Sequence, residues 1–244
     1  MQLPFFYIDH AAFLYDVIVL DENNSKHIVQ VLRMKEGEQL RLTDGLGRIY
    51  TADIVDAHKK KCSVKVIALT IAQPKNKNIS IAISPVKNNS RFEWFLEKAT
   101  EAGVSAIIPI ICTRSEKDHF RLDRMRGILI SAMLQSQQAF LPVLAAPIKF
   151  HDFIAVSANS FQKKYIAHCE ESERISLRKL LAQQQREGTG GLNNEIILIG
   201  PEGDFTKEEI LSATQSSYSP VVLGDTRLRT ETAGLVAAIL LCID

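Results

Sequence analysis

The stretch EIILIGPEGDFTKEEI joins a strand signal, a turn signal and a helix signal without interruption. Ile196–Ile199 form a run of large aliphatic residues without polar alternation, which is typical of a strand that helices cover on both faces of a parallel sheet. Gly200 and Gly203 then predict a tight turn, and the spacing of Thr206 and Glu209 fits a capping box at a helix start. Ligands of open α/β sheets bind at such turns, at the carboxyl ends of the strands. A turn that serves only the backbone is the alternative interpretation.

The order of strand, turn and helix recurs from residue 75 to residue 244. Such regular alternation predicts an α/β domain with a parallel sheet and helices on both of its faces. The predicted strands are NISIAISPV, AIIPII, KKYIAHC, EIILIG and PVVLG. The predicted helices are RFEWFLEKATEAGV, with Phe92, Phe95, Leu96 and Ala99 on one face and Gly103 as its C-cap, a segment near residues 121–138, SLRKLLAQQQ, TKEEILSAT and TETAGLVAAILLCI.

Residues 1–74 show a different pattern, in which short strand-like segments follow one another. These segments are DVIVL, EQLRLTD, RIYTADIVDA and CSVKVIALT. Between the first two, SKHIVQVLRM predicts a helix with Ile28, Val31 and Leu32 on one face. We therefore predict a small β-barrel, and the polar, proline-containing stretch AQPKNKN at residues 72–78 predicts the boundary with the α/β domain.

The chain carries a formal charge of +1, but its charged residues are unevenly distributed. Residues 75–150 contain eleven basic and six acidic side chains, a net charge of +5, and residues 151–244 contain nine and thirteen, a net charge of −4. Because local cationic density drives phosphate binding, a polyanion is expected to contact the middle segment or the cluster Lys59–Lys61. A solvated charged face is the alternative for that cluster.

Cysteine spacing and hydropathy argue against several classes of protein. The four cysteines lie far apart and share no metal-type spacing with the six histidines, so we expect reduced, buried thiols and no metal site. No segment reaches the roughly 20 apolar residues that a membrane span needs, and the stretch MQLPFFYIDHAA lacks the features of a signal peptide. These observations predict a cytoplasmic protein with no membrane partner.

The last predicted helix is apolar on nearly every side. Residues 235–243 contain only alanine, valine, leucine, isoleucine and one cysteine. Such a helix must be covered all round, and a domain of this size cannot easily cover it alone. A homodimer is one explanation, and burial within the monomer is the other.

The stretch VVLGDTRLRTETAG repeats the plan of the first glycine turn. A buried strand leads to Gly224, to a loop with Arg227 and Arg229, and to a helix that begins at Thr230. Together with GPEGD, this stretch resembles the RsmE-type 16S ribosomal RNA (uracil-N3)-methyltransferases of the SPOUT superfamily. RFEWFLEKATEAGV and HIVQVLRMKEGEQLRLTDG resemble the same family, so the likeness covers nearly the whole chain.

The resemblance implies a fold that no pattern argument provides. In that family a PUA-like β-barrel, here residues 1–74, precedes an α/β SPOUT methyltransferase domain, here residues 75–244. The C-terminal segment of that domain threads a deep trefoil knot, and the protein is a homodimer. The resemblance further implies S-adenosylmethionine-dependent methylation of N3 of a specific uridine in 16S ribosomal RNA of the assembled 30S subunit.

The resemblance also assigns residues to the site. S-adenosylmethionine is expected in a pocket formed by the loop after KKYIAHC, the GPEGD turn and the LGDTRLRTETA loop, where glycines let the backbone approach the ligand. The implied cofactor-binding residues are His168, Ile199, Gly200, Pro201, Glu202, Gly203, Leu223, Gly224, Leu228 and Thr230, with His168 at the rim. The RNA is expected to contact Lys26, Arg33, Lys59, Lys60, Lys61, Arg91, Arg114, Arg121 and Arg124.

Two side chains at the second turn suit this chemistry as catalytic residues. Arg229 can donate two parallel hydrogen bonds to the carbonyl oxygens that gain charge when a uracil N3 loses its proton. Glu231, or alternatively Glu202, is the nearest carboxylate to remove that proton. The helix dipole alone also favours an acid in a first turn, which is the structural alternative for Glu231.

The chain departs from the family pattern at two places. Asp204 stands where the family usually has glycine, and Leu134–Gln138 stands where it has a Glu-Gln-Ser-x-Arg segment. The second departure affects the RNA contacts or dimer packing expected there. Two other functions stay open: a SPOUT methyltransferase for another rRNA or tRNA nucleotide, and an RNA-binding dimer without catalysis.

Overall fold

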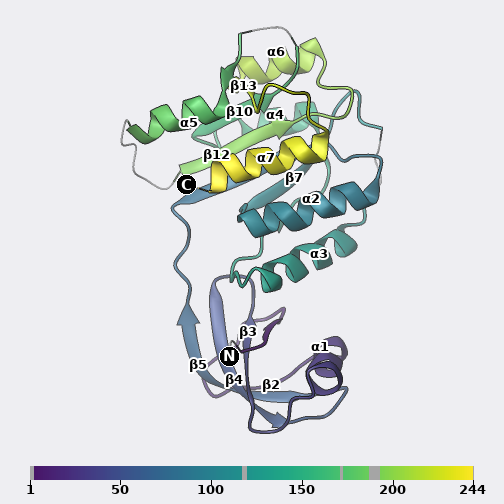
Figure 1. Ribbon diagram of the computed structural model, residues 1–244, viewed down its shortest axis with the longest axis vertical. Coiled ribbons are helices and arrows are strands. Elements are labelled where there is room, and N and C mark those ends of the chain that lie inside the picture. The colour runs from purple at the N-terminus through teal and green to yellow at the C-terminus, as the bar shows by residue number, and fades with distance from the viewer. Residues whose placement is uncertain (1–2, 117–119, 171–172, 187–192, 244) are drawn as a thin grey trace. The chain divides into compact units, whose positions relative to one another are not determined.

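The computed structural model describes residues 3–116, 120–170, 173–186 and 193–243 (Figure 1). The chain divides into two compact units. The first contains residues 1–74 together with residues 133–141, and the second contains residues 75–132 and 142–244. Nothing in the sequence pattern indicates that residues 133–141 belong with the first unit.

The first unit is built on a five-stranded sheet in the order β1-β3-β4-β5-β2. Its strands are β1 (Phe5–Tyr7), β2 (Val17–Val19), β3 (Gln39–Thr43), β4 (Arg48–Asp56) and β5 (Ser63–Ile71). Neighbours pair antiparallel except β1 and β3, which are parallel. The four predicted strands are confirmed and β1 is additional. Within the residues that the structure describes, the hydrogen-bonded order of this sheet runs from β1 at one edge to β2 at the other.

The predicted helix of this unit begins three residues earlier and is wound differently. Helix α1 (Glu22–Lys26) begins after Asp21, whose carboxylate accepts hydrogen bonds from two backbone amides, and it continues into a π-helical turn, η1 (His27–Val31). Ile28 is buried, but Val31 and Leu32 are exposed. The predicted common face of these three residues is therefore wrong, because a π-helical turn has more residues per turn than the α-helical spacing assumes.

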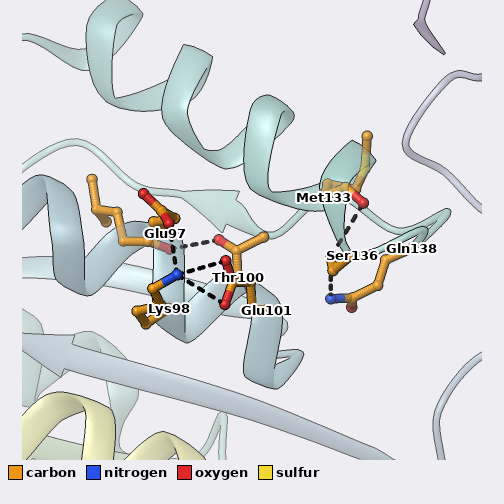
Figure 2. Close-up of polar contacts among 8 residues, drawn as sticks. Glu97, Lys98, Thr100, Glu101, Met133, Ser136 and Gln138 are labelled. Carbon is orange, nitrogen blue, oxygen red and sulfur yellow. Dashed lines mark hydrogen bonds and ion pairs between the residues drawn. The ribbon is translucent and has the colours of Figure 1, made fainter. Parts of the chain in front are cut away.

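Residues 133–141 complete the first unit at the turn between β3 and β4. The amide of Gly47 donates to the carbonyl oxygen of Ala139 at 2.9 Å, and the amide of Leu141 donates to that of Gly45 at 2.8 Å. A Cβ on Gly47 would lie 2.5 Å from the ring of Phe140, so this contact requires glycine. In Figure 2 the turn that opens this segment is held by hydrogen bonds among Met133, Ser136 and Gln138.

The second unit contains a parallel sheet in the order β11-β13-β10-β12-β6-β7-β8, with β9 paired to β7. Every pair in it is parallel, as predicted. The strands are β6 (Lys77–Ile83), β7 (Ala106–Ile111), β8 (Val143–Leu144), β9 (Ile148–Lys149), β10 (Lys163–Ala167), β11 (Ile175–Ser176), β12 (Asn193–Ile199) and β13 (Ser219–Val222). The short strands β8, β9 and β11 are not in the sequence prediction.

Helices cover both faces of this sheet. They are α2 (Asn89–Ala102), α3 (Leu122–Gln135), α4 (Phe150–Ser157), α5 (Leu177–Arg186), α6 (Lys207–Gln215) and α7 (Thr230–Cys242), of which only α4 is absent from the sequence prediction. Ile196 and Leu198 of β12 share a buried cluster with Phe150 of α4 and Phe205. Helices α2 and α7 lie side by side against the sheet (Figure 1). The two-sided burial predicted for Ile196–Ile199 is confirmed, since all four are buried.

Local signals at the helix ends behave as predicted. Thr206 and Glu209 form the capping box of α6, and Gly103 ends α2 with φ of 92°. On the polar face of α2, the ammonium of Lys98 lies 2.7 Å from a carboxylate oxygen of Glu97 and 2.9 Å from one of Glu101 (Figure 2). These pairs stabilise the helix only modestly because they are partly exposed.

Helix α7 is only partly covered within the chain. Gly234, Ala237, Ala238 and Leu241 are buried, whereas Ile239 is 41% exposed.

No helix in the part of the chain that the structure describes is both long enough and apolar enough to cross a membrane.

Candidate active site

A cavity of about 330 Å³ lies at the carboxyl ends of three neighbouring strands of the second unit. Strand β10 is hydrogen-bonded to β12 on one side and to β13 on the other, so the loops that follow these strands meet. The cavity is lined by Ala167, His168, Cys169, Arg174, Ile199, Gly200, Pro201, Glu202, Asp204, Val221, Val222, Leu223, Gly224, Thr226, Arg227, Leu228, Arg229, Thr230 and Ala233. Every residue predicted to bind the cofactor lines this cavity except Gly203.

At Gly200 and Gly203 of the first turn, the space that a side chain would need is occupied by other residues of the protein. A Cβ on Gly200 would lie 3.1 Å from the ring of Phe205, and a Cβ on Gly203 would lie 3.3 Å from the side chain of Arg114. Gly203, which the resemblance assigns to the cofactor, is thus not among the residues that line the cavity. Its carbonyl oxygen instead accepts a hydrogen bond of 2.7 Å from the Arg114 guanidinium, which holds the turn in place.

The second turn supplies the open wall of the cavity. Nothing lies within 4 Å of the position that a Cβ would take on Gly224. Two hydrogen bonds tie this turn to the first: the Thr230 hydroxyl donates to the carbonyl oxygen of Gly200 at 3.0 Å, and Arg227 donates to that of Glu202 at 3.4 Å. The two glycine turns thus form one structural unit around the cavity.

Asp204, the departure from the family pattern, has a left-handed backbone with φ of 63°. Glycine adopts this conformation freely, and aspartate tolerates it better than most residues. The Asp204 carboxylate accepts hydrogen bonds from the amides of Cys169 at 2.7 Å and Phe205 at 2.8 Å. Aspartate therefore keeps the turn that glycine would allow and adds a link to the loop after β10.

His168 lies deeper than predicted. Its side chain is 5% exposed, and neither ring nitrogen has a hydrogen-bond partner among the described residues. Burial lowers the pKa of the imidazole below its ordinary value, and Arg174 acts in the same direction, whereas Asp204 and Glu170 act in the opposite direction. The ring is therefore neutral at neutral pH, with its hydrogen-bonding capacity unused.

The buried imidazole predicts a stability change in acid. In the unfolded chain His168 takes up a proton near its ordinary pKa of 6.5, while the folded protein resists protonation until a lower pH. The stability that this neutral site contributes is present above pH 6.5 and is lost as the pH falls below it. We expect His168→Phe to reduce the loss of unfolding free energy between about pH 7.5 and about pH 5.5, measured by urea denaturation. Equal losses in the two proteins would contradict this assignment.

The predicted catalytic pair is not brought together. Arg229 lines the cavity, is exposed, and has no side-chain hydrogen bond or ion pair within the described part of the chain. Glu231 does not line the cavity; it is buried, and its carboxylate oxygen lies 3.7 Å from Nε of Arg91. In the structure Glu231 is thus paired with Arg91 in the first turn of α7.

Comparison with known proteins identifies the chain. A model described as an RNA methyltransferase domain matches residues 73–242, and one described as an RNA methyltransferase PUA domain matches residues 20–67. The chain is 30% identical over 250 residues to the ribosomal RNA small subunit methyltransferase E of Mycobacterium bovis, with 97% of this chain and 90% of that relative covered. The chain belongs to the ribosomal RNA small subunit methyltransferase E family.

Two solved structures share the fold of this family member. A protein from Porphyromonas gingivalis named "probable rRNA-methyltransferase" has a TM-score of 0.84 and 38% identity, with 97% of this chain and 95% of that chain covered. A ribosomal RNA small subunit methyltransferase E from Neisseria gonorrhoeae, solved bound to S-adenosyl methionine, has a TM-score of 0.81 and 25% identity over 97% and 95% of the two chains. The resemblance found in the sequence is confirmed, including an N-terminal PUA-like domain and an α/β methyltransferase domain.

The basic residues predicted for RNA contact in the methyltransferase domain are mostly engaged with the protein. Arg124 forms a bidentate pair with Glu93 at 2.6 and 2.9 Å. Arg91 lies near Glu231, and Arg114 bonds to the backbone of the first glycine turn. Arg121 is exposed. Arg114 therefore has a structural role that the sequence did not indicate.

The basic residues predicted for RNA contact in the PUA-like domain are exposed. Lys26 lies 2.7 Å and Lys60 lies 3.9 Å from the same carboxylate oxygen of Glu22, so these two cations share one anion. Lys59, Lys61 and Arg33 are exposed as well. All five of these basic side chains are therefore accessible to a polyanion.

Several cavity residues escape sequence reasoning. Asp204 adjoins the recognised GPEG motif, and Arg227 lies in the recognised second loop, so both had a local signal. Arg174 and Cys169 follow β10 in a stretch without a motif, and their place became visible only in the fold. Cys169 is exposed, contrary to the expected burial of the thiols.

Among the described residues, no group of three or more histidine, cysteine or acidic side chains could hold a metal ion.

Proposed function

We propose that this protein transfers a methyl group from S-adenosylmethionine to N3 of one uridine in 16S ribosomal RNA, acting on the assembled 30S subunit. The observation that carries the proposal is the single cavity formed by three strand ends in a member of this methyltransferase family. The ribosomal RNA small subunit methyltransferase E from Neisseria gonorrhoeae, solved bound to S-adenosyl methionine, supports the choice of cofactor.

The residues of the cavity fit that cofactor. The cavity volume of about 330 Å³ lies in the range of small-molecule sites. Gly224 leaves open space beside the backbone, and His168 offers two unused ring nitrogens from a buried position. Ile199, Pro201, Val221 and Leu228 supply apolar surface, while the glycine turns present backbone groups. S-adenosylmethionine would supply the methyl group there as an electrophilic sulfonium.

Arg229 is the residue that we assign to the substrate base. Its guanidinium is exposed at the cavity, and the backbone on both sides of it is held by Thr230 and Arg227. Two parallel N–H groups can bind the carbonyl oxygens that flank a uracil N3 and stabilise their charge as the proton leaves. A guanidinium stays protonated throughout, so this stabilisation does not depend on pH near neutrality.

Glu202 is the better candidate to accept the proton. Of the carboxylates that line the cavity in the described chain, Asp204 already accepts two amide hydrogen bonds, whereas Glu202 is exposed and bonds to Arg227 only through its carbonyl oxygen. Glu231 is buried beside Arg91 and lies off the cavity. We therefore assign proton transfer to Glu202, which is the alternative that the sequence left open.

The remaining features of the family belong to the same proposal. A trefoil knot in the C-terminal segment, which the resemblance implies, is part of it. A homodimer is supported by helix α7, which exposes Ile239 although the helix is almost wholly apolar; a monomeric mass in sedimentation velocity would refute it. A cytoplasmic location follows from a ribosomal substrate.

The direct test is a methyl-transfer assay with labelled S-adenosylmethionine. We expect incorporation into small subunits isolated from cells that lack the gene, and mass spectrometry should find the label in a single 3-methyluridine of 16S RNA. Free 16S RNA is expected to accept less label than the assembled subunit. Label in another nucleoside would favour a different target, and no label in any RNA would favour an RNA-binding protein without catalysis.

A further inference from the structure

One peptide group beside the cavity is held at both ends by side chains of opposite charge. This is the peptide between His168 and Cys169, directly after β10. Its carbonyl oxygen accepts a hydrogen bond of 2.6 Å from Nη1 of Arg174, and its N–H donates one of 2.7 Å to Oδ2 of Asp204. Because both partners are charged and both bonds are short, the orientation of this peptide is strongly fixed.

Asp204 is itself held firmly. Its amide donates to the carbonyl oxygen of Pro201 at 2.9 Å, which closes the first glycine turn, and its second carboxylate oxygen accepts the amide of Phe205 at 2.8 Å. Phe205 is fully buried in the core behind β12. The Asp204 carboxylate thus connects the core to the loop after β10. The backbone of Asp204 has a left-handed φ of 63°.

The fixed peptide carries the buried imidazole of His168. His168 is one of the residues that line the cavity, and neither of its buried ring nitrogens has a partner among the described residues. A buried polar group without a partner is costly, so a ligand that supplies the missing hydrogen bond gains affinity from it. That gain depends on the direction in which the ring points, because hydrogen bonds weaken steeply when they are misaligned.

We propose that Asp204 and Arg174 are positioning residues that clamp the His168–Cys169 peptide and so aim the His168 ring at a polar atom of the bound methyl donor. This inference rests on the proposed function, since it takes S-adenosylmethionine as the ligand. It assigns a purpose to the aspartate that stands in place of the usual glycine: the side chain adds an anchor for the neighbouring loop without altering the turn.

A double-mutant cycle tests the proposal. Asp204→Gly suits the left-handed backbone but removes the anchor, and His168→Phe keeps an aromatic ring but removes both nitrogens. By calorimetry, Asp204→Gly is expected to weaken S-adenosylmethionine binding on the order of tenfold, and the same change in the His168→Phe background is expected to weaken it less than about twofold. Asp204→Asn retains a carbonyl acceptor and should recover part of the lost affinity.

A charge-matched control separates clamping from simple electrostatics. Asp225 lies in the second loop, is exposed and does not line the cavity, so Asp225→Asn removes one negative charge nearby without touching the clamped peptide. We expect this variant to bind S-adenosylmethionine within about twofold of the parent. A loss equal to that of Asp204→Asn would overturn the proposal in favour of a general charge effect.

The remaining outcomes also distinguish the inference from the proposed function. If the parent protein binds neither S-adenosylmethionine nor S-adenosylhomocysteine, the proposed function fails. If the parent binds but the effects of Asp204→Gly and His168→Phe are independent, only the clamp is refuted. Should Asp204→Gly fold poorly, as judged by its thermal midpoint, the cycle is completed with Asp204→Asn, and independent effects there refute the clamp equally.

Discussion

Replacing Arg229 by alanine is expected to lower the rate of methyl transfer about 100- to 1,000-fold, the cost typical of removing one donor that stabilises charge in a transition state. The same change should alter the affinity for S-adenosylmethionine less than tenfold. The reason is that the Arg229 side chain has no bond to the protein in the described chain, while the hydrogen bonds that shape the cavity come from Thr230 and Arg227. Single-turnover kinetics with small subunits measure the rate of methyl transfer, and calorimetry measures the affinity for S-adenosylmethionine.

The conservative variant sharpens this test. Arg229→Lys keeps the positive charge but loses the two parallel N–H groups, so we expect it to recover only a small part of the lost rate. Asp225→Asn serves as the control in the same loop, because Asp225 is exposed and does not line the cavity. Parallel loss of rate and cofactor affinity in Arg229→Ala would make it a cofactor-binding residue instead.

The second large effect is expected at Gly234 in helix α7. A Cβ there would lie 2.7 Å from the methyl group of Ile83 on β6 and 2.7 Å from the ring of Phe95 on α2. Both neighbours are fully buried, so neither can move aside easily. We expect Gly234→Val to reduce the free energy of unfolding by about 3 kcal/mol or more, at the upper end of the cost of overpacking. Urea denaturation monitored by circular dichroism measures the change.

An alanine pair provides the control for Gly234. Gly127 lies in helix α3, is exposed, and has nothing within 4 Å of its Cβ position. Gly127→Ala should therefore stabilise the protein by up to about 1 kcal/mol, the intrinsic helix preference of alanine over glycine. Gly234→Ala gains the same preference but meets Ile83 and Phe95, so it is expected to destabilise. Equal effects of the two alanine changes would show that α7 does not pack as closely as described.

The periodic parts of the fold could be predicted because short-range physics determines them. An unbroken aliphatic run such as Ile196–Ile199 has to be buried on both faces, and the capping box of Thr206 and Glu209 satisfies backbone groups within one helical turn. The same local reasoning failed at Val31 and Leu32, where a π-helical turn rotates both side chains into solvent. The spacing of the apolar residues does not indicate that the turn at His27–Val31 is π-helical.

The site was predictable as a set of loops but not as a set of contacts. The glycine turns marked the right strand ends, and all but one of the expected cofactor residues line the cavity. Gly203 is the exception, and a glycine that admits Arg114 has the same sequence signature as one that admits a ligand. The role of Gly234 is likewise invisible in the sequence, since its neighbours Ile83 and Phe95 are more than a hundred residues away along the chain.

The first compact unit is not a continuous piece of chain, and this limits how the protein can be divided. A fragment that ended at Pro74 would lack residues 133–141. The carbonyl oxygen of Gly45 and the amide of Gly47 would then lose Leu141 and Ala139 as partners, and the surface against Phe140 would be exposed to water. The first unit is therefore not self-sufficient as a fragment, because a cut at the linker separates it from its closing segment.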